Sequence, residues 1–221
     1  DRLRRYLACL LEDLPQPLDY SLLRPLLLNS EGLVYQVLSG VAKTDQHLSE
    51  EHVLKAHVRI EHGLVEEPLV FVGSAHMAGD VEATAASLRQ ALGFDLDERQ
   101  QLRTWTDALR LFIQQADALG ILVMCSGVVR NNNYRHLDPD EFRGFAIADK
   151  LAPLVFLNGA DTKAAQMFTL AHELVHIWIG QSAVSDTQSS QLPEHKVERW
   201  CNQVAAELLV SVAVLRREYR K

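Results

Sequence analysis

The sequence predicts an α+β fold, in which a small β-sheet precedes two helices near the C-terminus. Apolar residues recur at helical spacing in the first half of the chain and again at its end. Between these regions lie short apolar runs, rich in β-branched residues and bounded by Gly, Pro or Asn, as strands are. The 221 residues are 48% hydrophobic and 23% charged, so the chain can bury an ordinary globular core.

Residues 1–65 are predicted to form a mostly helical N-terminal region. A helix over 2–13 ends at Pro15, and further helices follow over 20–28, over 32–41 and from Ser49. The region contains seven Lys or Arg and nine Asp or Glu, whereas a DNA-reading domain is normally basic. We therefore expect a packing or partner-binding role rather than DNA binding. A lid, a dimerisation element and a sensor are the open alternatives.

The middle of the chain combines helices with strands. Two helices are predicted over 80–93 and 97–118. Four extended segments are predicted: Pro68–Gly73 is a strand or linker, Gly120–Cys125 is a buried strand, and Phe142–Ala148 with Leu154–Asn158 form a hairpin. The polar residues 131–136 are predicted to be a loop.

A helix over about 164–179 follows the hairpin, capped by Asp161 or Thr162 and ended by Gly180 in the C′ position. The Ser- and Gln-rich residues 181–193 are predicted to be a loop. A last helix starts at Glu194 and runs through Leu209, with an extension to Leu215 left open. We expect the chemistry to lie on these two helices.

The helix over 164–179 contains the motif His-Glu-x-x-His. His172 and His176 are four residues apart and so share one helical face, while Glu173 is one step round. Two imidazoles can bind Zn²⁺, and the carboxylate can take a proton from the metal-bound water. A buried His is more often a hydrogen-bonded core residue than a ligand. This helix, however, is apolar nearly all round, and burying these three side chains without partners would cost several kcal/mol.

A catalytic zinc site needs a third protein ligand and an open position. The last helix offers Glu194, His195, Glu198 and Glu207. Glu198 is the preferred ligand, although alone it would be interpreted as a solvated surface acid; Glu194 and His195 are the alternatives. Asn202 lies one turn beyond Glu198 and could hold the free N–H of a ligating His.

Charge, cysteines and hydropathy exclude several classes of protein. The net charge of −7 disfavours phosphate backbones as partners. Three widely spaced cysteines give no disulfide framework and no CxxC metal site, which indicates a reducing, cytoplasmic location. No apolar run reaches the roughly 18 residues of a membrane span. We expect no signal peptide, and the start at Asp1 indicates a fragment or trimmed chain.

The stretch from Phe168 to His176, followed by that from Glu198 to Val210, resembles the ImmA/IrrE-type metallopeptidases. Their usual pattern is Phe-Thr-Leu-Ala-His-Glu-Leu-Gly-His, then Glu-x-x-Ala-Asn-x-Phe-Ala-Ala-x-Leu-Leu-Met-Pro. The resemblance covers roughly residues 80–221 and is strongest over 140–211. It implies a zincin-like metallopeptidase domain over residues 66–221, with His172, His176 and Glu198 as zinc ligands and Glu173 as catalytic base.

Three departures from the pattern stand out: Val175 replaces Gly, Cys201 replaces Ala, and Val210-Ser211 replace Met-Pro. The first two concern helix packing. Cys201 is three residues from Glu198, so a role beside the metal or in redox sensing competes with the simpler interpretation of a small buried residue. We find no convincing helix-turn-helix before the peptidase region, although many relatives carry one.

The predicted activity is zinc-dependent peptide hydrolysis, in which Glu173 takes the proton of the zinc-bound water. Tyr134, His136 and His195 are candidate oxyanion donors, and the hairpin edge is a candidate site for an added substrate strand. By resemblance, the substrate is a bacterial helix-turn-helix repressor, cut under stress or during mobile-element induction. One alternative is a partner-binding or regulatory module on the same scaffold. The other is a zinc hydrolase with a non-peptide substrate.

Overall fold

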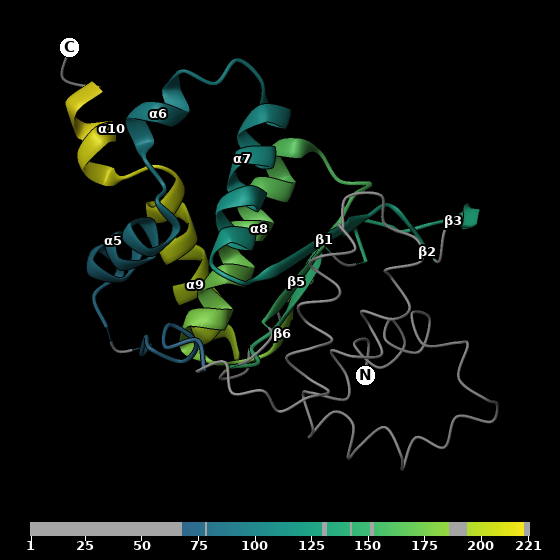
Figure 1. Cartoon of the computed structure of the whole chain (residues 1–221), viewed down its shortest axis with the longest axis horizontal. Helices are drawn as coiled ribbons and strands as arrows, with labels where there is room; N and C mark the ends of the chain where they lie inside the picture. The colour runs from purple at the N-terminus through teal and green to yellow at the C-terminus, as the bar shows by residue number, and fades with distance from the viewer. Residues whose placement is uncertain are drawn as a thin grey trace.

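The computed structural model describes residues 68–77, 79–129, 132–141, 143–150, 153–185 and 194–218 (Figure 1). The helices are α5 (Val81–Leu92), α6 (Leu96–Gln100), α7 (Trp105–Ala118), α8 (Lys163–Ile179), α9 (Glu194–Leu209) and α10 (Val212–Glu218). The strands are β1 (Leu122–Ser126), β2 (Val128–Val129), β3 (Asn132–His136), β4 (Gly144–Ile147), β5 (Leu154–Asn158) and β6 (Ala183–Ser185). This is the predicted α+β class. The predicted helical region 1–65 and its boundary with residues 66–221 lie outside the described residues.

Four strands form the main sheet in the order β1–β5–β4–β6. The predicted hairpin is confirmed as the antiparallel pair β4–β5, in which Phe145 lies opposite Phe156. β1 runs parallel to β5, and β6 runs antiparallel to β4. Both edges of the hairpin are therefore already paired. The prediction that a substrate strand could add to the hairpin itself is wrong, because β1 covers β5 and β6 covers β4, so that among the described strands β1 and β6 form the edges of this sheet.

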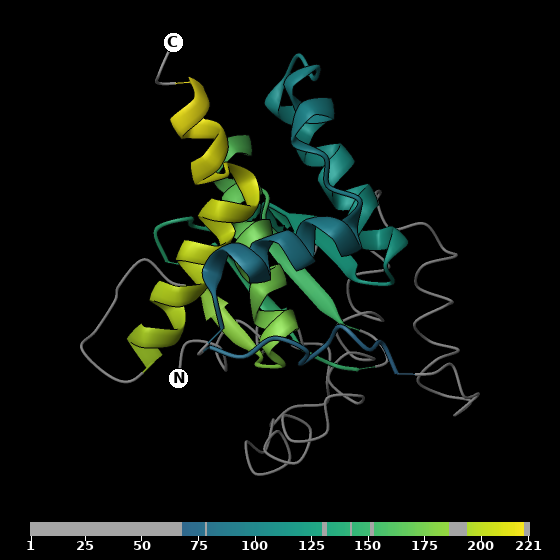
Figure 2. The same ribbon diagram turned by 90° about the vertical axis from the view of Figure 1, so that its left-hand side faces the viewer.

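Helix α8 lies against the sheet, and α7 and α9 pack on it (Figures 1 and 2). α8 contacts β4, β5 and β6, while α9 contacts α8 and α5. The core is built from the apolar faces of these elements. Its largest fully buried side chains include Phe112, Leu170, Leu174 and Ile177. In the described part of the chain, no helix combines the length and the apolar character that crossing a membrane requires.

Local capping explains one correction to the predicted helices. The single helix expected over 97–118 is two helices, because two residues each start a helix of their own. The Asp95 side chain accepts from the backbone N–H groups of Asp97 and Glu98 to start α6, and the Thr104 side chain accepts from that of Asp107 to start α7. Asp95 and Thr104 are recognisable cap residues in the sequence, but the helical spacing of apolar residues continues past Thr104 and predicted one uninterrupted helix.

Pairing partners explain the other corrections. The expected loop over 131–136 contains β3, which pairs with β2, and the expected loop over 181–193 contains β6, which pairs with β4. Such short strands are defined by their partners rather than by their own composition. Residues 70–73, expected to be extended, form a turn. The last helix ends at Leu209, and α10 begins separately at Val212.

The ends of α8 are fixed as predicted. Thr162 is the N-cap, since its side chain accepts a hydrogen bond from the backbone N–H of Ala165. Gly180 adopts the left-handed conformation with φ of 70°. A Cβ on Gly180 would lie 3.0 Å from Cα of Gly73, whose N–H donates to the Ile177 carbonyl. Gly180 therefore serves both as a helix end and as a point of close backbone approach.

Candidate metal centre

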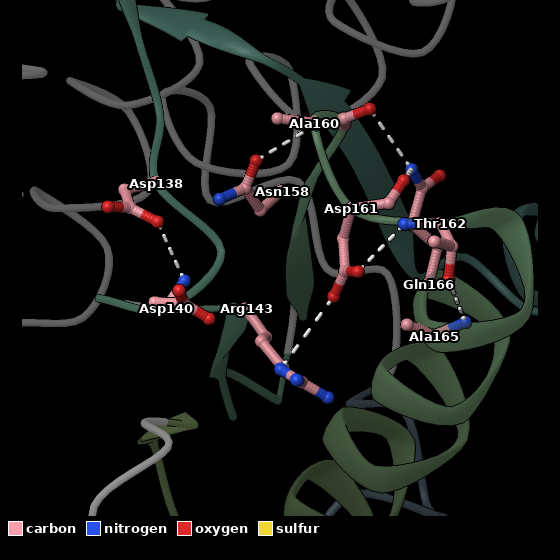
Figure 3. A network of polar contacts seen from close by, with 10 residues as sticks. Asp138, Asp140, Arg143, Asn158, Ala160, Asp161, Thr162, Ala165 and Gln166 are labelled. Atoms are coloured by element: carbon pink, nitrogen blue, oxygen red, sulfur yellow. Dashed lines mark hydrogen bonds and ion pairs between the residues drawn. The ribbon is translucent and has the colours of Figure 1, made fainter.

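The first turn of α8 is attached to the sheet by a polar network at the end of β5 (Figure 3). The Gln166 side-chain amide donates to the carbonyls of Gly159 and Asp161, and Asn158 accepts from the N–H of Ala160. Arg143, just before β4, lies 3.7 Å from the Asp161 carboxylate. These contacts fix the position of α8 relative to β4 and β5, and with it the three side chains of its central turns.

His172, Glu173 and His176 are all buried on α8, with exposed fractions of 4%, 0% and 1%. The Nε2 atoms of His172 and His176 lie 3.0 Å apart. Glu198 of α9 faces both, with Oε2 3.0 Å from Nε2 of His172 and Oε1 3.2 Å from Nε2 of His176. The packing of α9 on α8 thus brings together the three residues predicted to be ligands; one potential ligand atom from each lies within 4.8 Å of the others.

The donor set fits a zinc ion. Two nitrogens at zinc's bond length of about 2.0 Å, in tetrahedral geometry, are about 3.3 Å apart. The spacings of 3.0 and 3.2 Å between the facing atoms are close to that value. Two imidazoles and one carboxylate also match the histidine and glutamate ligands of known catalytic zinc sites, which leave a position open.

The hydrogen bond that Asn202 accepts from His172 indicates a cation at the centre. Nδ1 of His172 lies 3.0 Å from Oδ1 of Asn202, which holds the ring with its proton on Nδ1. In neutral His172, the lone pair of Nε2 therefore points at the Glu198 carboxylate, which is itself only an acceptor. A proton or a metal ion between them resolves this conflict.

The pKa values of the two groups express the same requirement. Burial lowers the pKa of His172, but the hydrogen bond to Glu198 and the charges of Glu173 and Glu198 outweigh it, and the net pKa is raised. Burial raises the pKa of Glu198, but hydrogen bonds from His172 and His176 lower it to about 2. The centre therefore favours one positive charge beside an ionised carboxylate, whether that charge is a proton or a metal ion.

Glu173 lies beside this group under the strand β4. A Cβ on Gly144 would lie 3.5 Å from Oε1 of Glu173, 2.6 Å from the Thr169 side chain and 2.7 Å from the backbone oxygen of Phe156. The absence of a side chain at Gly144 thus allows β4 to lie directly over Glu173. Sequence reasoning missed Gly144, although a Gly inside a strand is a signal of close approach.

The other candidate residues are placed elsewhere. Glu207 lies 3.8 Å from Arg89 and accepts from the backbone N–H of Val212, so its carboxylate orders the start of α10. Tyr134 and His136 are exposed on β3, which projects well away from α8 and α9 (Figure 1). The side chains of Glu194 and His195 lie outside the described part of the structure.

Cys201 is fully buried in the core formed by α9. Burial, followed by the charges of Glu198 and Glu173, raises the pKa of its thiol well above the usual range. A thiol in this setting remains protonated and behaves as a small apolar residue. The arrangement favours the packing interpretation of Cys201 over a redox role.

Residues 116–221 match the family model described as the IrrE N-terminal-like domain of the M78 peptidases. This part of the chain belongs to the ImmA/IrrE-type metallopeptidase family. No curated protein and no solved structure shows a significant match. The match begins in the last turn of α7, whereas the predicted resemblance began at about residue 80. Helix α5, which precedes the matched residues, nevertheless packs on α9 within the same core. The metallopeptidase-type domain contains every residue of the candidate metal centre.

Proposed function

We propose that this ImmA/IrrE-type domain is a zinc-dependent endopeptidase. The observation that carries the proposal is the convergence of His172, His176 and Glu198 beside the buried carboxylate of Glu173. A zinc ion held by these three ligands would supply a Lewis acid that polarises a peptide carbonyl and lowers the pKa of a water.

Glu173 is the general base in this proposal. Its carboxylate accepts the proton of the attacking water and can return that proton to the amine leaving group. Three features keep Glu173 near the reacting atoms: its position next to His172, its complete burial, and the backbone of Gly144 above it. Asn202 holds His172 in the tautomer that presents the Nε2 lone pair.

The substitution Glu173→Gln tests the activity. It removes the base but keeps the size of the side chain, so the variant should retain zinc and lose cleavage by at least about a hundredfold. Glu82→Gln, at an exposed acid of α5, is the matched control and should cleave like the wild type. A Glu173→Gln protein that still cuts would contradict the mechanism. If zinc and biological function both survive without cleavage, the scaffold alternative is favoured.

The substrate proposed is a helix-turn-helix transcriptional repressor or a similar regulatory protein, cut in a stress or mobile-element response. The family resemblance supports this class. Glu173→Gln should hold its substrate without releasing products, so a pull-down with this variant, compared with Glu173→Gln that also carries His176→Ala, identifies proteins bound through an intact metal centre. Recovery of no DNA-binding regulator in the metal-dependent fraction would contradict this substrate class.

A further inference from the structure

A cavity of about 570 Å³ lies at the opposite end of α8 and α9 from the loop that joins them. Figure 2 shows α10 and the α6–α7 pair rising beside each other at this end, and residues of both line the cavity together with the first turns of α8. Its volume is within the range of small-molecule sites, about 300–1,000 Å³. It contains none of the residues of the metal centre.

The lining is apolar, and its rim is unusually exposed. Leu102, Met167 and Val214 contribute to the walls. Trp105, Phe168 and Val210 also line it and have exposed fractions of 63%, 38% and 47%. Large apolar side chains that gather around a concavity while remaining in contact with water mark a ligand-binding surface.

Arg99 gives this apolar cavity a charge. Its guanidinium carbon lies 4.1 Å from the centre of the Phe94 ring and 5.6 Å from that of Phe112. Nη2 donates to the Met167 sulfur at 3.4 Å, a weak acceptor, and the buried Nη1 has no hydrogen-bond partner. Burial lowers the pKa of Arg99 to about 10, so the group remains charged at neutral pH.

In the described part of the chain, no neighbouring acid balances the charge of Arg99. Among the described residues, no carboxylate lies within ion-pair distance of Arg99, and those that line the cavity include a second cation, Arg103, but no Asp or Glu. A partly buried cation with soft partners gains more from an added anion than a solvated surface arginine does, because its own hydration is already reduced.

We propose that this cavity binds a small monocarboxylate with an apolar body, whose carboxylate pairs with Arg99 while its chain or ring lies among the apolar walls. A monocarboxylate fits better than a phosphate, because the apolar walls penalise a second negative charge. The ligand would contact Met167 and Phe168, one turn or so before His172, so the site lies on the helix that carries the metal ligands. The proposal does not depend on peptidase activity.

Calorimetric titration of the full chain with decanoate, decanol and decylamine, in the presence of EDTA, tests the proposal. Decanoate should bind at least about tenfold more tightly than decanol, because a charge-assisted hydrogen bond contributes that much, and decylamine should bind least. Arg99→Met should weaken decanoate about tenfold and leave decanol nearly unchanged. Arg110→Met, at an exposed arginine of α7 outside the cavity, is the matched control.

Two further variants locate the bound ligand. Ala164→Phe, at an exposed rim position, should fill the cavity and weaken decanoate without the folding risk of a core change. Decanoate should change the fluorescence of Trp105, which lines the cavity, and Trp105→Phe should abolish that change while the heat of binding remains. No decanoate binding, equal affinity for decanol and decanoate, or full affinity in Arg99→Met or Ala164→Phe would each overturn the proposal.

Discussion

The hydrogen bond between Asn202 and His172 offers a sharp test of how the metal centre is built. Asn202→Ala removes the acceptor that keeps the proton of His172 on Nδ1, 3.0 Å away. Without this acceptor, the His172 ring can adopt the other tautomer or rotate. Metal binding must then also restrict the ring to one tautomer and one orientation, which lowers the affinity. Loss of such supporting hydrogen bonds typically costs about 10–100-fold in metal affinity.

The structure places the expected effect near the lower end of that range. Asn202 is an exposed residue, so water can partly replace its carbonyl oxygen as acceptor. We expect zinc affinity to fall about tenfold, or about 1.4 kcal/mol. Stability of the metal-free protein should change by no more than about 1 kcal/mol, the usual net contribution of one hydrogen bond.

Competition against a chromophoric chelator measures the zinc affinity of wild type, Asn202→Ala and the control Gln203→Ala. Gln203 is the adjacent exposed amide on α9, so its removal changes helix propensity and surface polarity by a similar amount. A loss below about twofold in Asn202→Ala, or an equal loss in Gln203→Ala, would refute the proposed role of Asn202.

Three further predictions follow from the same geometry. Zinc affinity should fall as the pH drops below neutrality, because His172, with its raised pKa, must release a proton to bind the ion while Glu198 stays ionised. Calorimetry in two buffers of different ionisation enthalpy should detect the released proton. Zinc binding that does not depend on pH would contradict this prediction. Gly144→Ala should lower the free energy of unfolding by about 1–3 kcal/mol in denaturant titration, because its Cβ would lie 2.7 Å from the Phe156 backbone oxygen. An unchanged unfolding midpoint would show instead that β4 can move to accommodate the methyl group. Leu174→Ala should cost about 2–5 kcal/mol in the same assay, because Leu174 is fully buried between α8 and its neighbours, and a loss below 1 kcal/mol would show that the core collapses into the space.

The candidate metal centre was predictable to an unusual degree because its geometry is largely local. His172, Glu173 and His176 lie within five residues, and helical spacing alone puts both imidazoles on one face. The caps at Thr162 and Gly180 are equally local, since each depends on one side chain or on one backbone conformation. Glu198 and Asn202 followed from a second helical spacing on an amphipathic helix, which already favoured Glu198 over Glu194 and His195, and the resemblance to a known family implied the same ligand.

Tertiary structure alone decided the remaining features. β3 and β6 are strands only because β2 and β4 lie beside them. The hairpin edges are covered by strands that are distant in sequence, which overturned the predicted site for a substrate strand. Gly144 reaches Glu173 across the contact between sheet and helix.

The sequence by itself therefore determined the metal-binding residue types and their helical spacing, because a helix fixes the relative directions of residues three and four apart. Packing decided which acid completes the centre, by bringing Glu198 to within 3.2 Å of both imidazoles and directing Glu207 to Arg89 and α10. Packing also produced the charged apolar cavity around Arg99, whose lining comes from five separate helices and the segments between them. No local pattern encodes such a site, because its residues become neighbours only when the helices assemble on the sheet.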